Sequence, residues 1–193
     1  MQNIFKLDSR NSIRGAAEQL ACVLKDNYRD IKAGKWTKKN FEMLSGFCEK
    51  RFGLDPKTDC FHSYHPKGGN AFLYDFLAVK RESGAILVAE SEQDAGSNFL
   101  HDFEKLFYVY APIRLFICKS KNENKEKEII EKLTEYADGQ CLNFNPGTVL
   151  LLHFDGHTGQ DRGDKPSQSY IWQNKGEPNR KRLKAGTLKF KPL

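Results

Sequence analysis

Two glutamates close an apolar stretch of the sequence. Residues 85–92 read AILVAESE, so Glu90 and Glu92 follow a run that a folded strand would bury. Side chains two apart on a strand point to the same face, so both carboxylates should share the face of Ile86 and Val88. An isolated carboxylate is costly to desolvate. The spacing therefore indicates either a bound cation or a shared proton at this end of the strand.

A third acid lies on the preceding apolar stretch. Residues 70–79 read NAFLYDFLAV, and the polar KRESG separates them from AILVAESE, which is typical of a β-hairpin. The hairpin would bring Asp75 opposite Glu90, and with Glu92 three acids would converge. A divalent cation relieves such repulsion, and carboxylate oxygens suit Mg²⁺ or Mn²⁺. The sequence therefore predicts a metal site held by Asp75 and Glu90. The alternative is one Glu paired with Lys or Arg and the other acids in solvent.

The elements around these acids define a fold class. Apolar residues recur at helical spacing on both sides of the hairpin, and Ser12 and Gly53 fit an N-cap and a helix stop. The predicted order is an α/β protein with a mixed sheet and helices on both faces. In chain order the predicted elements are helices over 12–28 and 36–53, strands over 70–79 and 85–92, a helix over 97–111 ended by Pro112, a strand over 113–120, a helix over 124–139, a strand over 147–156 and an edge strand over 169–173.

The chain reads as a single domain over residues 1–193. It would comprise a helical part over 1–55, a catalytic-type core over 60–155, and a loop with a basic end over 156–193. No apolar run approaches the roughly 20 residues of a membrane span, and no secretory signal begins the sequence. Five scattered cysteines without a CxxC pair argue against a disulfide framework. We therefore expect cytoplasmic residence and no membrane partner.

Positive charge gathers near the carboxy terminus. The net charge is +6, and residues 175–193 hold seven lysines and arginines against one acid, Glu177. Such a segment is typical of a protein that binds a polyanion, although a solubilising tail has the same composition. The residues expected to contact nucleic acid are Arg180, Lys181, Arg182 and Lys184.

The acids and their context resemble the PD-(D/E)xK nuclease superfamily, which has the restriction-endonuclease-like fold. The resemblance covers residues 70–120: FLYDF, then ILVAESE, then a helix with DFEKLF and the strand PIRLFI. A short first strand in CFHSYH would complete its core. By resemblance, Asp75 and Glu90 match the metal-binding acids, and Glu92 stands where lysine is usual, which is an ExE variant. Lys105 would be that lysine moved to the next helix, unless it pairs only with Asp102 one turn away.

The resemblance implies a Mg²⁺- or Mn²⁺-dependent nuclease, foremost a DNA endonuclease, with a homodimer as a further expectation. Glu92 can accept a proton but supplies no positive charge, so Lys105 would help it to position the attacking water. The missing third-position lysine supports a different interpretation. In that alternative the chain is an inactive nuclease-like domain that serves as a nucleic-acid-binding or protein-interaction module.

Two other groups have the spacing of metal ligands. CFHSYH offers Cys60, His62 and His65 for zinc, although further ligands are not evident. In LLHFDGH, the side chains of His153, Asp155 and His157 would share one face if the strand continues that far, and this set suits zinc or iron. Ordinary packing of a strand end is the alternative for both.

Overall fold

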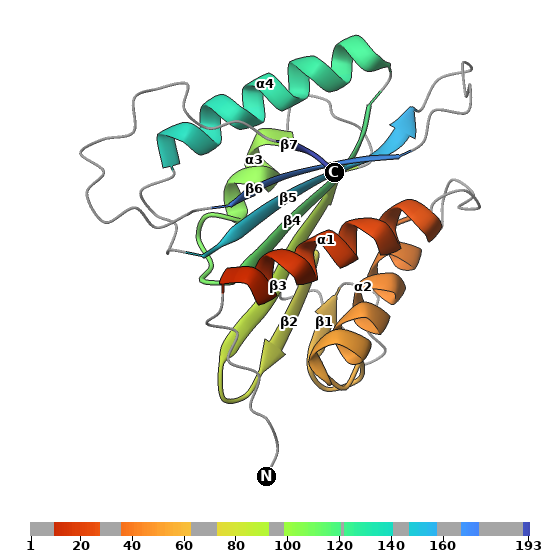
Figure 1. Ribbon diagram of the computed structural model, residues 1–193, viewed down its shortest axis with the longest axis vertical. Helices are drawn as coiled ribbons and strands as arrows, with labels where there is room; N and C mark the ends of the chain where they lie inside the picture. The colour runs from red at the N-terminus through yellow and green to blue at the C-terminus, as the bar shows by residue number, and fades with distance from the viewer. Residues whose placement is uncertain are drawn as a thin grey trace.

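The described part of the chain forms four helices and seven strands (Figure 1). The structure is a computed structural model that describes residues 10–27, 36–62, 73–92, 99–120, 122–140, 147–157, 167–173 and 191–193. The helices are α1 (Arg10–Asn27), α2 (Trp36–Phe52), α3 (Phe99–Lys105) and α4 (Glu123–Gln140). The strands are β1 (Cys60–His62), β2 (Phe76–Lys80), β3 (Gly84–Glu92), β4 (Ile113–Ser120), β5 (Val149–His157), β6 (Gln168–Gln173) and β7 (Lys191–Pro192).

All the described strands belong to one mixed sheet whose order follows the chain from β1 to β7. The three central strands, β3, β4 and β5, run parallel, and the remaining neighbours pair antiparallel. Parallel neighbours need a crossover, and the helices α3 and α4 lie in the two connections between them. The α/β class and the mixed sheet are therefore confirmed.

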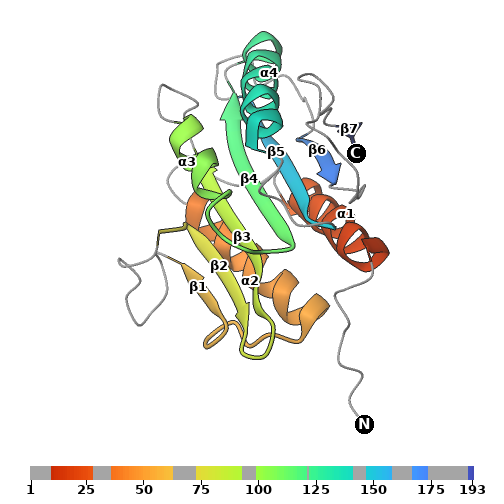
Figure 2. The ribbon, with the colours of Figure 1, turned by 90° about the vertical axis from the view of Figure 1, so that its left-hand side faces the viewer.

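Helices cover both faces of the sheet, as Figure 2 shows. On β4 the side chains alternate: Leu115 and Ile117 join the apolar cluster with α1 and α2, while Phe116 and Cys118 join the cluster with α3 and α4. Strands buried on both sides need such continuous apolar sequence, and residues 113–118 are almost entirely buried. The second cluster belongs to the face that also carries the acidic site.

The β2–β3 hairpin has the predicted turn and an irregularity that the sequence does not reveal. Gly84 adopts φ of +77°, a conformation that favours glycine, where the chain enters β3. Ala78 pairs with Leu87 but Val79 pairs with Ala85, so Ile86 is the extra residue of a β-bulge. The bulge turns Ile86 toward α1 and α2, whereas Val88 packs with α3. The prediction that both face the same side as the glutamates is therefore wrong for Ile86.

The helix α3 ends earlier than predicted. It stops at Lys105, although the apolar spacing continued to Tyr110, which is exposed. The buried guanidinium of Arg114 donates hydrogen bonds to the carbonyls of Leu106 and Ala111. These carbonyls lie where a longer helix would pass, so a contact with the next strand ends α3 in place of Pro112.

Two smaller expectations are also corrected. The helix α1 begins at Arg10, so Ser12 lies within its first turn and is not its N-cap. The strand β6 is not an edge strand, because β7 pairs with its outer side. Gly53, by contrast, ends α2 as predicted, with φ of +68° and its N–H bonded to the carbonyl of Glu49.

Within the described residues, no helix combines the length and the apolar character that crossing a membrane requires.

Candidate functional site

Asp75 lies immediately before β2 and is held by the neighbouring strand. Phe76 pairs with Ala89, which places Asp75 beside Glu90, as the predicted hairpin required. Ser91 donates two hydrogen bonds to Asp75 Oδ2, one from its backbone N at 2.8 Å and one from its Oγ at 3.0 Å. The carboxylate of Asp75 is therefore oriented by β3 and not by its own strand.

Glu90 is the most strongly perturbed acid of this region. Its side chain is fully buried, and its Oε1 has no hydrogen-bond partner among the described residues. Burial raises the pKa of Glu90 to about 8. The hydrogen bond from Lys105 lowers this pKa in part, and the charges of Asp75 and Asp102 raise it. Burial therefore favours the protonated form of this carboxyl group, and positive charge at the site favours the ionised form.

Lys105 reaches from α3 to the acid on β3. Its Nζ donates to Glu90 Oε2 at 2.7 Å and lies 2.9 Å from Asp102 Oδ1. Burial disfavours the charge on Lys105, but the hydrogen bonds to Glu90 and Asp102 outweigh burial, so the pKa of Lys105 is raised. The two interpretations of this residue hold together: it points toward the site acids and also pairs with Asp102 one turn away.

Glu92 does not join a three-acid cluster. It ends β3 on the face of Glu90, two residues and about 7 Å further along the strand. The second acid whose charge raises the Glu90 pKa is Asp102 of α3. In the described ranges, no group of three or more His, Cys, Asp or Glu side chains is placed to hold a metal ion. The predicted convergence of Asp75, Glu90 and Glu92 is therefore wrong, because the hairpin brings only Asp75 beside Glu90.

Two further side chains lie in the electrostatic range of this region. The pKa of Tyr74 is raised by burial and by the charge of Glu90, and it is lowered in part by Arg114 and Lys105. Arg114 is buried against the segment that follows α3, and burial lowers its pKa to about 10. Two acids, Asp75 and Glu90, and two basic groups, Lys105 and Arg114, therefore lie within electrostatic range of Tyr74 or Glu90.

The donor set fits a magnesium-type ion with few protein ligands. Mg²⁺ commonly uses one or two carboxylates and keeps several waters, so a third acid is not required. Asp75 accepts both bonds from Ser91 on Oδ2, and Glu90 accepts the bond from Lys105 on Oε2, while Glu90 Oε1 has no hydrogen-bond partner among the described residues. Asp75 and Glu90 are thus the residues that could hold a divalent cation.

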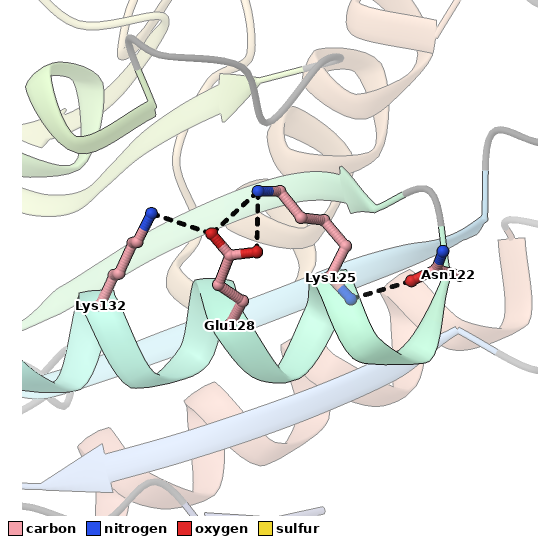
Figure 3. Close-up of polar contacts among 4 residues, drawn as sticks. All are labelled: Asn122, Lys125, Glu128 and Lys132. Atoms are coloured by element: carbon pink, nitrogen blue, oxygen red, sulfur yellow. Dashed lines mark hydrogen bonds and ion pairs between the residues drawn. The ribbon is translucent and has the colours of Figure 1, made fainter.

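The exposed ion pairs of α4 show what an ordinary surface network looks like in this protein. Lys125 and Lys132 both contact Glu128, and the carboxamide of Asn122 accepts from the N–H of Lys125 near the start of the helix (Figure 3). Hydrogen bonds from Lys132 and Lys125 lower the pKa of Glu128. Glu128 is solvated and fully partnered, so it differs from the buried Glu90 in each respect that matters for binding a cation.

The zinc set that begins at Cys60 is not assembled by the described residues. Cys60 is a buried free cysteine whose pKa is lowered mainly by a hydrogen bond from Cys48. The ring of His62 stacks on Phe76 at 6.1 Å between centroids. His65 lies outside the described residues. Cys60 and His62 therefore pack against other side chains of the fold, Cys48 and Phe76.

The set on β5 has a similar outcome. The strand does continue to His157, as that prediction required, but the side chain of His157 lies outside the described part. His153 is buried with its Nδ1 2.8 Å from Ser169 Oγ, and Asp155 lies 3.6 Å from Lys119 Nζ. The two described members of this set thus have protein partners.

The residues predicted to contact nucleic acid, Arg180, Lys181, Arg182 and Lys184, lie outside the described residues. The structure describes residues 167–173 before them and residues 191–193 after them. Gln173 ends β6, and Lys191 begins β7, which pairs with β6. Leu193 then donates its N–H to the carbonyl of Ser169 and accepts a bond from Lys25 of α1. Both flanks of the basic segment are therefore anchored to the sheet.

Sequence reasoning missed two residues of the site. Ser91 stands between two glutamates, and strand alternation points its side chain away from both, so spacing alone does not suggest a contact with Asp75. Asp102 was noted only as a neighbour of Lys105. Its place three residues earlier on a helix was a usable signal for the observed pair.

Comparisons of the chain with protein-family models, with curated proteins and with solved structures found no match.

Proposed function

We propose that the protein is a divalent-metal-dependent nuclease, foremost a DNA endonuclease, whose site is formed by Asp75, Glu90 and Lys105. One observation carries the proposal. A fully buried glutamate, Glu90, lies beside a second acid, receives a lysine on one oxygen and has no hydrogen-bond partner among the described residues on the other. Burying an acid in this way is costly, and a bound cation would offset the cost. The resemblance to PD-(D/E)xK nucleases belongs to the same proposal.

Each residue has a role that follows from its position. Asp75 and Glu90 would hold Mg²⁺ or Mn²⁺, which would act as a Lewis acid on a phosphodiester oxygen and lower the pKa of bound water. Lys105 places a positive charge beside Glu90, where negative charge develops during attack on phosphorus. Glu92, further along the same face of β3, accepts a proton from the attacking water.

The substrate class follows from charge. The basic residues Arg180, Lys181, Arg182 and Lys184 would contact the phosphate backbone, so affinity for nucleic acid should fall steeply as salt is raised. Cutting both strands of a duplex in one binding event with one site per chain would use two copies, so a homodimer is part of this proposal.

The test is a cleavage assay with supercoiled plasmid, labelled single-stranded DNA and labelled RNA, each with Mg²⁺, with Mn²⁺ and with EDTA. We expect metal-dependent cutting by the wild type and a loss of at least about 100-fold in Asp75→Asn, because a direct ligand should matter at least as much as an outer-shell partner. Asparagine keeps an oxygen that can accept from Ser91, so the variant should fold. Glu128→Gln removes one carboxylate from the surface of α4 and is the matched control.

The alternative function, a nuclease-like module without chemistry, gives a different result in the same assay. If the folded wild type cuts none of the substrates with either metal but still binds nucleic acid in a salt-sensitive way, the nuclease proposal is wrong and the binding module takes its place. If Asp75→Asn cuts as fast as the wild type, the acids described here are not the site.

A further inference from the structure

The contact between Ser91 and Asp75 is unusual for a hairpin. The β2–β3 pairing ends at Phe76 and Ala89, so no residue of β2 lies opposite Ser91. Its backbone N–H bonds instead to the side chain of Asp75, and its hydroxyl donates to the same oxygen, Oδ2. A carboxylate thus takes the place of the next backbone partner and ends the ladder at the site.

Two donors on one oxygen have a geometric consequence. They fix the rotation of the Asp75 carboxylate, and because both engage Oδ2, Oδ1 takes no part in this pair of bonds. Glu90 has the same division, because Lys105 engages Oε2 and Oε1 has no partner in the described part of the chain. The two acids are adjacent across the hairpin, and each keeps one oxygen for a further partner.

We infer that Ser91 is a positioning residue for a divalent cation, and that it acts by holding Asp75 so that this acid and Glu90 each offer one oxygen to the ion. The inference rests on the proposed function, which it deepens by assigning Asp75 Oδ1 and Glu90 Oε1 as the ligand atoms. Groups that orient a metal ligand typically change metal affinity by about 10- to 100-fold when they are lost. Ser91 lies between Glu90 and Glu92 in AESE, but the acid that it orients is Asp75, next to the neighbouring strand.

The test compares Mn²⁺ binding to the wild type, Ser91→Ala, Ser91→Thr and Asp75→Asn by calorimetry, together with thermal unfolding without metal. Ser91→Ala removes the hydroxyl and keeps the backbone N–H bond, so the hairpin should still form. We expect Ser91→Ala to weaken Mn²⁺ binding about tenfold, as for other outer-shell groups. Ser91→Thr restores a hydroxyl at the same position and suits a strand, so it should recover most of the affinity.

The outcomes separate this inference from the proposed function. If the wild type binds Mn²⁺, Asp75→Asn does not, and Ser91→Ala binds like the wild type, the role of Ser91 is wrong while the metal site stands. If Ser91→Thr binds as weakly as Ser91→Ala and both have lowered melting temperatures, the hydroxyl is a structural group only, and the inference is overturned. If the folded wild type binds no Mn²⁺, both the inference and the metal site are overturned.

Discussion

Glu90 and His153 are both fully buried polar residues of this sheet, and they differ in what surrounds them. Glu90 on β3 has Asp75 and Lys105 as neighbours, and burial raises its pKa to about 8. His153 on β5 contacts the neutral hydroxyl of Ser169, and burial, with a smaller effect of Lys25, lowers its pKa to about 3. Burial suppresses the charge of each group. Only Glu90 has a second acid beside it, which is the arrangement that a cation would complete.

The comparison suggests how a structural polar group can be distinguished from a functional one. A buried histidine that stays neutral and bonds Ser169 through Nδ1 carries no charge that a nearby cation would offset. A buried glutamate beside an aspartate favours its protonated form, and the charge of Lys105 offsets this only in part. A ligand that brings positive charge therefore changes the state of Glu90 and leaves that of His153 unchanged.

The largest expected effect separates the two residues by metal binding. At pH 8 and above, Glu90→Gln should lose at least about 100-fold in Mn²⁺ affinity and in metal-dependent cleavage, because a ligand charge is removed. His153→Gln should keep both properties. Isothermal titration and the plasmid assay measure them, and equal Mn²⁺ affinity in the two variants would remove the distinction between the two regions.

The next effect is a stability profile with opposite signs. A carboxyl group whose pKa is raised in the folded state takes up a proton on folding, so Glu90 makes the metal-free protein lose stability as the pH rises from 4.5 to about 8. The expected change is on the order of 5 kcal/mol. Denaturant unfolding in EDTA should show this slope in the wild type and not in Glu90→Gln. A slope that is identical in both would contradict the raised pKa.

His153 should act in the other direction. Its pKa is lowered in the folded state, so its contribution to stability is complete above pH 6.5 and is lost as the pH falls toward 3. The expected loss is also on the order of 5 kcal/mol, added to that of other groups that titrate in acid. The acid-side slope of unfolding free energy should be smaller in His153→Gln. Unchanged acid sensitivity in that variant would show that His153 is not held neutral.

The smallest effect is expected on the surface of α4. Glu128 is solvated, and exposed pairs such as those with Lys125 and Lys132 contribute little to stability and are screened by salt. Glu128→Gln should have a thermal midpoint close to that of the wild type, and 1 M salt should remove any difference between them. A marked loss of stability would show that removing an exposed carboxylate matters as much as removing a buried one. That result would contradict the contrast between Glu128 and Glu90.

Much of the fold was predictable because its signals are local. The change from helical spacing to a hairpin pattern located β2 and β3, and the polar KRESG between them became the turn that Gly84 completes. The pairing of Asp75 with Glu90 followed from the hairpin alone. The alternation of helices and apolar strands after residue 97 then predicted the mixed sheet with helices on both faces.

The remaining features depend on contacts between distant residues. The bulge at Ile86 shifts the faces of β3 without any glycine or proline to mark it. The helix α3 ends where the buried Arg114 of the next strand binds the carbonyl of Leu106. The bonds from Ser91 to Asp75 exist because β2 begins one residue later, at Phe76. None of these contacts has a periodic pattern in the sequence, so each required the packed structure.

The most direct measurement is anomalous diffraction from crystals grown with Mn²⁺ near pH 8, which locates the ion independently of any activity. We predict one Mn²⁺ peak within coordination distance of Asp75 Oδ1 and Glu90 Oε1, with Ser91 still bonded to Asp75 Oδ2. A map without a peak between these two carboxylates, and with Lys105 bonded to Glu90 as it is here, would contradict the assignment of this site.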